Sequence, residues 1–156
     1  MISYPYLPLG RTIHYVPSSN PFMQEAEKVQ KTSGDLVQPV GAVVVRDGTI
    51  LGSGANQGGF KSKRLIEIHK AGFCVRKLLS VKSGEKYWLC PGCASPKNHA
   101  EPRAITDAQS RHGTILGADI YLCGHWWCCK SCWDKMIEAG IRDVYLLEES
   151  DKLFKK

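Results

Sequence analysis

The spacing of apolar residues changes along the chain, and the first clear pattern predicts a β-hairpin. Residues 40–45 are an apolar, mostly β-branched run and residues 49–52 are a second apolar run, separated by Arg46-Asp47-Gly48. An Asp-Gly pair between two apolar runs is a strong hairpin signal, because the tight turn needs residues that tolerate a positive φ. The sheet is therefore expected to open with an antiparallel pair of strands.

In the last third of the chain, helical and strand-like spacing alternate. Residues 100–111 and 129–139 place apolar side chains at helical spacing, whereas residues 119–122 and 144–147 are short apolar runs typical of strands. Gly140 follows the second helix as a C-terminal stop. Alternating strands and helices predict a layered α/β fold with a partly parallel sheet.

The N-terminal part of the chain is less regular. Three prolines within residues 1–20 predict an irregular arm or a strand-like lead-in. Asn20, a good capping residue, stands directly before Pro21, and proline is favoured at the first position of a helix. A short amphipathic helix is expected to start here and to end near Gly34.

Residues 60–98 form a long, basic segment that bears several cysteines and fits neither pattern. Helical spacing is found only near residues 64–70. The segment is too short to bury a core of its own, so we interpret it as an insertion within a single domain that covers residues 1–156.

Composition excludes several classes of protein. The chain has 156 residues, of which 43% are hydrophobic, as in ordinary globular domains. No apolar run is long enough to cross a bilayer, so no membrane partner is expected. Residues 1–6 lack the regions of a secretory signal, which favours a cytoplasmic location. In that reducing compartment, seven cysteines at short spacings are better interpreted as metal ligands or catalytic thiols than as disulfides.

The formal charge of +6 suggests an anionic partner, either a nucleotide phosphate or a nucleic acid. Lys61, Lys63 and Arg64 form a basic run that could contact a substrate phosphate, although such a run is also typical of a solvated face. Lys155 and Lys156 are interpreted as a solvated tail. We further expect the chain to form a homo-oligomer.

The strongest chemical pattern is His99-Ala100-Glu101, followed by Cys129-x-x-Cys132. Two cysteines one turn apart at a helix start can reach a single ion, and the positive end of the helix dipole favours their thiolate forms. With His99 as a third ligand, one tetrahedral position stays open for water, which distinguishes a catalytic zinc from a closed structural one. Bound zinc lowers the pKa of its water to about 7, and Glu101 is close enough to carry that proton to a substrate ring.

Together these motifs resemble the cytidine and deoxycytidylate deaminase superfamily over roughly residues 40–148. The resemblance implies a three-layer α-β-α sandwich with a mixed sheet, in which both metal-bearing helices enter the site at their N-termini. It also implies that Asn56 lies at the substrate and that Glu101 is both proton shuttle and partner of the base. Ala100 is expected to contact the substrate as well. The similarity extends to Gly41-Ala42-Val43-Val44-Val45, Gly54-Ala55-Asn56, Ala104-Ile105 and Ile137-x-x-Gly140-Ile141-x-x-Val144.

The chain departs from this family pattern at one position. Members usually have proline before the first cysteine, whereas this chain has Cys128. Cys128 could compete as a ligand, or the turn could be looser; we favour Cys129 because Cys-x-x-Cys fits both the geometry and the resemblance. His99, Cys129 and Cys132 could instead form a purely stabilising zinc site, but the glutamate and the open position would then have no explanation.

A second candidate metal site lies in the insertion, where His69, Cys74, Cys90 and Cys93 follow the pattern His-x4-Cys-x15-Cys-x2-Cys. Four such ligands leave no open position and would form a closed structural zinc, ordering a loop with too few apolar residues to fold alone. Some deoxycytidylate deaminases resemble this arrangement. A solvent-facing helical histidine is the alternative for His69, and Cys123 is interpreted as a buried thiol.

Aromatic residues His125-Trp126-Trp127 stand just before the metal cysteines. Trp126 could stack on a base, a contact worth about 1–3 kcal/mol in single-strand binders. Alternatively, one tryptophan belongs to the core and the other caps the pocket. His125 could contact a phosphate or cap a turn.

These patterns predict a zinc-dependent hydrolytic deaminase of a cytosine nucleotide, with conversion of dCMP to dUMP as the leading reaction. A base deaminase that acts on RNA or single-stranded DNA is the alternative enzyme, motivated by the positive charge and the paired tryptophans. A zinc-stabilised binding module without catalysis is the third hypothesis, and the intact Glu101 argues against it.

Overall fold

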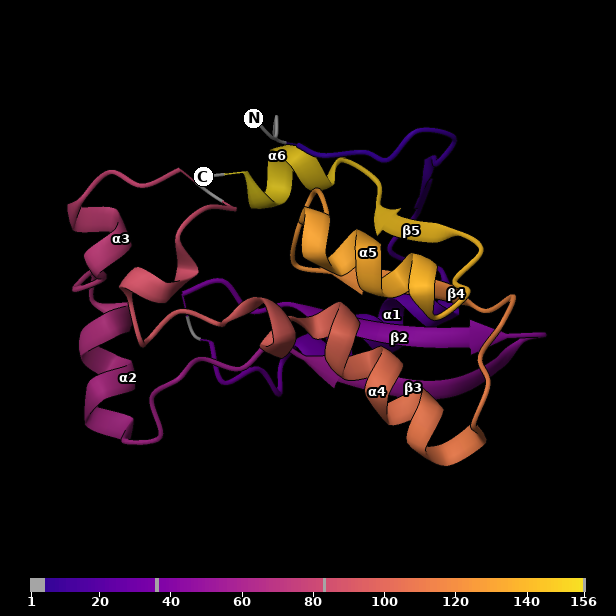
Figure 1. Cartoon of the computed structure of the whole chain (residues 1–156), viewed down its shortest axis with the longest axis horizontal. Helices are drawn as coiled ribbons and strands as arrows, with labels where there is room; N and C mark the ends of the chain where they lie inside the picture. Colours follow the sequence, from indigo (N-terminus) through magenta and orange to yellow (C-terminus); the bar gives the residue numbers. More distant parts are fainter. Residues whose placement is uncertain (1–4, 36, 83, 156) are drawn as a thin grey trace.

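The computed structural model describes residues 5–35, 37–82 and 84–155 and contains one five-stranded sheet (Figure 1). Residues 1–4, on which part of the secretion argument rests, and Lys156 lie outside the described residues. The sheet order is β1-β5-β4-β2-β3. Strands β1, β5 and β4 are parallel, whereas β2 is antiparallel to both β4 and β3. Their bounds are β1 (Ile13–Val16), β2 (Gly41–Arg46), β3 (Thr49–Ala55), β4 (Asp119–Cys123) and β5 (Val144–Leu147).

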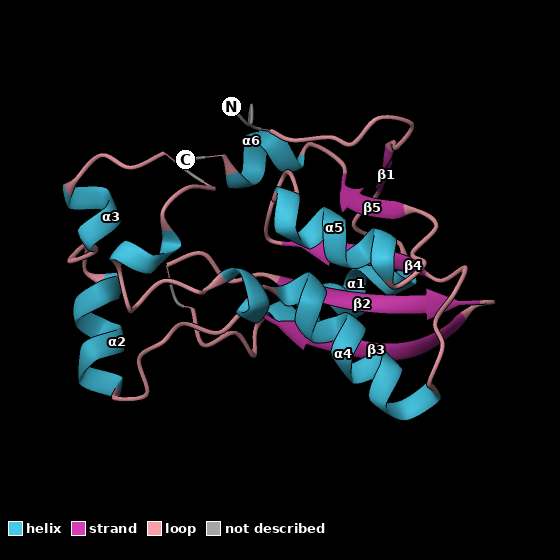
Figure 2. Cartoon of the chain, in the orientation of Figure 1, coloured by secondary structure: helices cyan, strands magenta, loops and turns pink. Residues whose placement is uncertain are grey.

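Helices cover both faces of this mixed sheet (Figure 2). Helix α1 (Pro21–Gln30) packs on one face, and α4 (Ala100–His112) and α5 (Lys130–Glu138) pack on the other. Strand β2, which lies between β4 and β3, is buried on both sides, because its alternate side chains enter two separate cores. Val43 and Val45 pack toward α1, and Ala42 and Val44 toward α4 and α5. This is the expected three-layer α-β-α sandwich.

Two glycines of β3 set the position of α4. A Cβ atom at Gly52 would lie 2.4 Å from the backbone nitrogen of Ala108, and one at Gly54 would lie 2.4 Å from that of Ala104. Because neither strand residue has a side chain, the helix backbone lies directly on the strand. The Asp107 carboxylate accepts from the Ser53 N–H at 2.9 Å and fixes the register. The close packing aims the start of α4 at the end of β3.

The local signals for the hairpin and the first helix hold in the structure. Asp47 and Gly48 adopt positive φ values of 51° and 75° in the turn between β2 and β3. The Asn20 side chain accepts from the N–H groups of Phe22 and Met23 at 3.0 and 3.1 Å, so it caps α1.

The structure differs from the sequence expectations at the end of α1 and at the C-terminus. Helix α1 ends at Gln30 rather than near Gly34, because the Gly34 N–H donates to the Asn56 carbonyl at 3.2 Å and holds the chain in a turn. In the N-terminal arm the strand-like alternative holds, because residues 13–16 form β1 and pair in parallel with β5. A short C-terminal helix, α6 (Ser150–Phe154), was not predicted from the sequence pattern.

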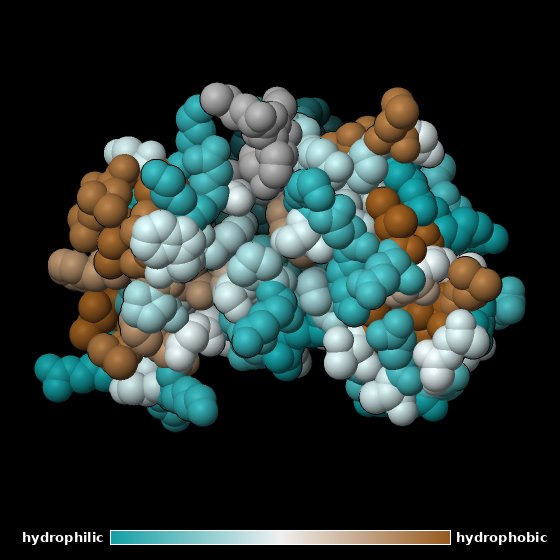
Figure 3. Space-filling model, in the orientation of Figure 1, coloured by the Kyte–Doolittle hydropathy of each residue, from teal (hydrophilic) through white to brown (hydrophobic). Residues whose placement is uncertain are grey.

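Residues 60–98 form a segment beyond one end of the sheet, which we call the insertion (Figure 1). Apolar side chains gather over it on the face shown in Figure 3. The described part of the insertion contains α2 (Lys63–Lys70), α3 (Val75–Leu78) and the 3-10 helices η1 (Tyr87–Leu89) and η2 (Pro96–Asn98).

Within the described ranges, no helix is long and apolar enough to span a membrane.

Candidate metal centre

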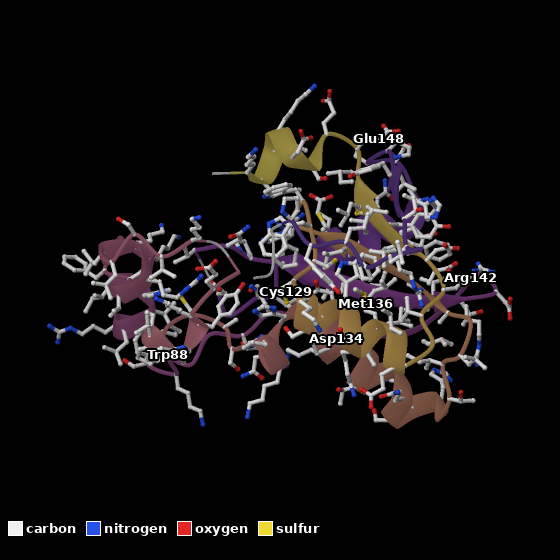
Figure 4. The ribbon with its side chains drawn as sticks, turned by 45° about the horizontal axis from the view of Figure 1, so that its top comes forward. Trp88, Cys129, Asp134, Met136, Arg142 and Glu148 are labelled. Atoms are coloured by element: carbon white, nitrogen blue, oxygen red, sulfur yellow. The ribbon has the colours of Figure 1, made fainter. Side chains whose placement is uncertain are left out.

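The two halves of the main motif meet at the end of the sheet that faces the insertion. Strands β1, β3, β4 and β5 have their carboxyl ends here, and ligands of open α/β sheets bind at such edges. His99 is the residue directly before α4, and Cys129 is the residue directly before α5. Figure 4 shows Cys129 at the start of its helix, between the sheet and the insertion. Both helix N-termini therefore point at one place.

His99, Cys129 and Cys132 lie close enough to share one ion. The His99 Nδ1 atom is 3.3 Å from the Cys132 Sγ and 3.5 Å from the Cys129 Sγ. The two sulfur atoms are 3.0 Å apart. Around a tetrahedral zinc ion such ligand atoms are separated by about 3.5–3.8 Å. The distances from His99 match this arrangement. The two sulfur atoms would have to move apart by less than an ångström, which is about the difference between their separation in a thiol hydrogen bond and their separation around one metal ion.

The two cysteines differ in their readiness to ionise. The hydrogen bond between the two thiols lowers the pKa of Cys129 to about 4, and the neighbouring His99 acts in the same direction. The same bond, together with burial, raises the pKa of Cys132 well above its usual range. Cys129 therefore carries the first thiolate, the form of cysteine that binds metals.

Glu101 lies beside this group and is shielded from solvent. Its side chain is only 5% exposed. Burial and the charge of Cys129 raise the pKa of its carboxyl, so this group can hold a proton more readily than an exposed glutamate. A buried carboxyl that gains and loses a proton near a metal group has the chemistry of a general acid and base.

Cys128 contacts the glutamate rather than joining the metal group. Its side chain is 1% exposed and hydrogen-bonds to the Glu101 carboxyl. The ligand group in this part of the described chain comprises His99, Cys129 and Cys132 without it. The competing assignment of Cys128 as a ligand is therefore not favoured by the geometry, and sequence reasoning did not anticipate its contact with the carboxyl.

His99 is held in place by two residues of the insertion. The Tyr87 ring packs edge-on against the imidazole, with centroids 4.9 Å apart. Burial alone would lower the pKa of His99, but Cys129, the Glu101 charge and a backbone hydrogen bond to Ala94 together raise it. Since Nδ1 faces the two sulfurs, this backbone bond uses the other ring nitrogen. Metal-binding histidines are commonly oriented in this way by an outer carbonyl.

A cavity of about 420 Å³ opens over these residues, a volume within the usual range for small-molecule sites. It lies between the sandwich and the insertion, and both contribute to its wall. His99, Ala100, Glu101 and Cys129 form one side. The expected substrate-contact residues Asn56 and Trp126 also line it.

Asn56 is engaged by the protein itself. Its Oδ1 atom accepts from the Val40 N–H at 2.8 Å and from the Ser33 hydroxyl, while its Nδ2 donates to the Gln38 carbonyl at 2.8 Å. The side chain is 6% exposed and lines the cavity. An amide nitrogen has two hydrogens, so one remains for a ligand while the other bonds order the cavity wall.

The two tryptophans divide as one of the alternatives predicts. Trp127 is 4% exposed and belongs to the core, whereas Trp126 is half-buried at the cavity with Lys155 Nζ 5.2 Å from its ring centroid. His125 caps the turn that connects β4 to the two tryptophans, because its Nδ1 accepts from the Trp127 N–H at 3.2 Å. Burial lowers the pKa of His125 to about 4, so the imidazole is neutral with its hydrogen on Nε2.

The cations at the cavity are not those suggested by the sequence. Lys61, Lys63 and Arg64 are exposed and do not line it. Arg76, Lys77 and Lys155 do so instead, a placement that only the folded insertion and C-terminus could bring about. Arg76 is largely occupied: its guanidinium donates to two backbone carbonyls of the insertion and lies 4.4 Å over the ring of Tyr87.

The second candidate group also comes together. The ligand atoms of His69, Cys74, Cys90 and Cys93 lie within 4.8 Å of one another. Sγ of Cys93 is 3.6 Å from that of Cys74 and 3.7 Å from His69 Nε2, separations that suit a tetrahedral ion. His69 is 5% exposed, and burial lowers its pKa toward the neutral form that binds metals. The alternative of a solvent-facing His69 is therefore wrong.

Comparison with known proteins agrees with this geometry. The family model for the cytidine and deoxycytidylate deaminase zinc-binding region matches residues 17–148. In structure, the chain is similar to the dCMP deaminase of cyanophage S-TIM5 in its apo form, with 22% identity, 86% of each chain covered and a TM-score of 0.51. The complex of that enzyme with dCMP and dUMP gives 23% identity, coverage of 85% and 84%, and the same TM-score.

A more distant similarity is found to guanine deaminase from Bacillus subtilis, with 19% identity, 85% of this chain and 66% of that chain covered, and a TM-score of 0.47. No curated protein matches the chain significantly in sequence. The structural likenesses concern the fold.

Proposed function

Because the chain belongs to the cytidine and deoxycytidylate deaminase family, we propose that it is a zinc-dependent hydrolase that removes the ring amino group of a cytosine nucleotide, with dCMP as the preferred substrate. One observation carries the proposal. His99, Cys129 and Cys132 converge at the wall of a cavity in which the buried Glu101 stands beside them. Three ligands and a neighbouring carboxyl are what a hydrolytic metal site requires.

The reaction needs a nucleophile and a proton carrier. When bound by these three side chains, zinc would supply Lewis-acid activation of water at neutral pH. Glu101 accepts a proton from the attacking water and delivers it to the ring nitrogen of the base. A second proton passes through the same carboxyl to the amino group, which leaves as ammonia while the ring carbon gains the oxygen. The raised pKa of Glu101 suits a group that must be protonated and deprotonated in turn.

The cavity offers separate contacts for the base and the phosphate. Trp126 presents an aromatic ring for stacking, and the remaining amide hydrogen of Asn56 can donate to the nucleoside. Lys77 and Lys155 are the cations best placed for a phosphate, since neither forms an ion pair with a described residue. A nucleotide therefore fits the charge of this cavity better than a free base does.

We also propose a second, structural zinc held by His69, Cys74, Cys90 and Cys93. Burial opposes ionisation of Cys90, but hydrogen bonds from the backbone of Val75 and Gly92 lower its pKa, so the turn itself favours a thiolate. Four protein ligands leave no position for a substrate, and such sites stabilise folds rather than catalyse reactions.

This second site would order the part of the insertion that holds His99. Cys93 is followed directly by Ala94, whose backbone bonds to the imidazole. Arg76 Nη1 lies 3.6 Å from the Cys93 sulfur, and the same guanidinium packs on Tyr87. The two metal groups are thus linked through the insertion, and loss of one ion would disturb the orientation of His99 in the other.

A substrate screen with metal counting tests the main proposal. Ammonia release is measured with dCMP, CMP, deoxycytidine, cytidine, and adenine and guanine compounds, on protein whose zinc content is known. The expected result is turnover of cytosine nucleotides, fastest with dCMP, and a rise in KM for dCMP, but not for deoxycytidine, in Lys77→Ala. Turnover of oligonucleotides, but of none of these small compounds, would replace dCMP with a polynucleotide as the proposed substrate. Inactivity toward every compound at full zinc loading would indicate a non-catalytic module and overturn the proposal.

A further inference from the structure

The positive charge of the chain is concentrated in the insertion. Residues 60–98 contain nine Lys or Arg and two Asp or Glu, a formal charge of +7, which exceeds the +6 of the whole chain. The sandwich and the termini together are therefore slightly acidic. The excess positive charge therefore belongs to one segment of the chain, and it calls for an explanation in terms of a partner.

The charges of the insertion are not compensated within the protein. Apart from Arg76, which bonds to backbone carbonyls, the basic residues of the segment are exposed, and none forms an ion pair with a described residue. Outside the insertion, lysines are mostly paired, as in Lys28 with Glu25 and Lys130 with Asp134. The exposed set is Lys61, Lys63, Arg64, Lys70, Lys77, Lys82, Lys86 and Lys97.

Eight exposed cations exceed what a mononucleotide can use. One phosphate carries at most two charges, and Lys77 alone among the eight lines the catalytic cavity. The remaining seven lie on the outer surface of a segment of 39 residues. Clustered cations that a small substrate cannot reach fit a polymer with a regular series of phosphates.

Exposed aromatic rings accompany these charges. Trp88 is 80% exposed and Phe73 is 68% exposed, and both belong to the insertion. Figure 4 places Trp88 among the elements of the insertion, away from Cys129. Unpaired bases stack on such rings, whereas the bases of a duplex are already stacked on one another. A single strand therefore fits this surface better than a duplex does.

A second copy of the chain is a poorer occupant. In a symmetric dimer the same surface faces itself, so pairing through the insertion would bring two segments of +7 together. The exposed apolar residues of the insertion would have to outweigh that repulsion. A single strand of nucleic acid would place its phosphates against the lysines and stack its bases on the aromatic rings.

We propose that the insertion is a docking surface for single-stranded nucleic acid, held by its uncompensated lysines and by Trp88 and Phe73. This site is separate from the catalytic cavity and does not depend on the proposed deamination. It would retain the protein on a strand beside its small-molecule site.

The test measures binding of fluorescein-labelled (dT)12 by anisotropy over a series of salt concentrations. Thymine has no amino group to remove, so the outcome is independent of catalysis. Each phosphate contact with a single strand contributes about −0.7 to the slope of log K against log salt. The expected slope is about −3 or steeper, corresponding to four or more contacts.

A matched pair of variants locates the surface. Lys61→Glu/Lys63→Glu/Arg64→Glu should weaken binding at least tenfold and make the slope shallower by about 2, because three contacts are lost. Lys28→Glu/Lys31→Glu/Lys152→Glu makes the same change in total charge at lysines that are 69–71% exposed outside the insertion. This control should change the affinity less than threefold. Equal weakening in both variants would overturn the proposal.

A second comparison tests the rings. Trp88→Ala should weaken binding of (dT)12 at least fivefold but leave binding of an abasic strand of the same length unchanged. Leu79→Ala, at a residue that is 61% exposed in the same segment, should leave both unchanged. Equal affinity of the wild-type protein for the two strands would contradict stacking. Binding to phosphatidylglycerol vesicles without binding to (dT)12 would assign the surface to anionic membranes and overturn the proposal.

Discussion

At the scale of single residues, His125 shows how burial fixes a protonation state at the cavity. Its Nδ1 accepts from the Trp127 N–H, and burial lowers the pKa of the ring to about 4. In an unfolded chain the pKa is about 6.5. Between these two values the unfolded chain binds more protons than the folded one, so stability is complete above the higher value and falls as pH decreases through this window.

This linkage predicts a difference between the wild-type protein and His125→Asn, which keeps an acceptor but cannot titrate. From pH 7 to pH 4.5 the free energy of unfolding should fall by about 2 kcal/mol more in the wild type than in the variant. Urea denaturation of both proteins at the two pH values measures this difference in the free energy of unfolding. Equal losses in both proteins would show that the folded imidazole titrates normally.

Cys128 is the residue at which this chain departs from the proline usual in its family. Its thiol is buried and bonds to the Glu101 carboxyl. Because a hydrogen bond to a charged group contributes about 1.5–3 kcal/mol, Cys128→Ala should lower kcat about tenfold or more and leave KM and zinc content unchanged. Cys128→Ser should restore most of the activity.

The control for this prediction is Cys123→Ala, because Cys123 is also buried but lies outside the site, next to Gln30. This variant should keep the wild-type kcat. A kcat for Cys128→Ala equal to that of the Cys123→Ala control would show that the thiol does not position the carboxyl.

At the scale of secondary-structure elements, the start of α1 depends on one side chain. Asn20 caps two backbone N–H groups, and loss of such a cap costs about 1 kcal/mol. Asn20→Ala should therefore lower the free energy of unfolding by about that amount. Ser19→Ala, at the exposed neighbouring position, should change it by a few tenths at most. Chemical denaturation of the two variants side by side decides the point.

The insertion is the element whose order is expected to depend on metal. Cys90→Ser/Cys93→Ser should reduce the zinc content from two ions to one per chain. It should also speed amide exchange in residues 87–99, since this stretch connects the second cluster to His99. Cys123→Ser is the control and should retain both ions. A single zinc ion in the wild-type chain would contradict the proposed second site.

The elements that the sequence predicted correctly are those with local signals. The Asp47-Gly48 turn, the Asn20-Pro21 helix start and the Cys-x-x-Cys spacing each act within a few residues. Strand β1 was expected only as one of two alternatives, and helix α6 was not predicted. The first is stabilised by parallel pairing with a strand about 130 residues away, and the second is short and has its Phe154 packed against the core beneath α1. Tertiary contacts of this kind leave no periodic pattern in the sequence.

At the scale of the whole molecule, the distinction between local signals and tertiary contacts also separates the proposed metal ligands from the residues that surround them. The residue types and spacing were enough to propose His99, Cys129, Cys132 and Glu101, which the fold brings to one cavity. The outer contacts from Tyr87, Ala94 and Cys128 depend on how the insertion and the loop before α5 fold over the site. The cations of the cavity also come from separate parts of the chain, and a basic run in the sequence pointed to the wrong ones.

The fold places the two proposed sites side by side. The sandwich brings two helix N-termini to one sheet edge, and the insertion closes the cavity above them. The outer surface of the insertion carries the exposed lysines of the proposed nucleic-acid site. The expected homo-oligomer stays a prediction, and any contact between copies should use the less basic surfaces of the sandwich.

The central claim is that Glu101 moves protons beside a zinc ion held by His99, Cys129 and Cys132. The most direct measurement is the rate of ammonia release from dCMP, together with zinc content, in the wild-type protein and in Glu101→Gln. The variant should keep its zinc and lose at least about a hundredfold in kcat, the usual contribution of a general acid and base. Near-normal turnover in Glu101→Gln would contradict the account.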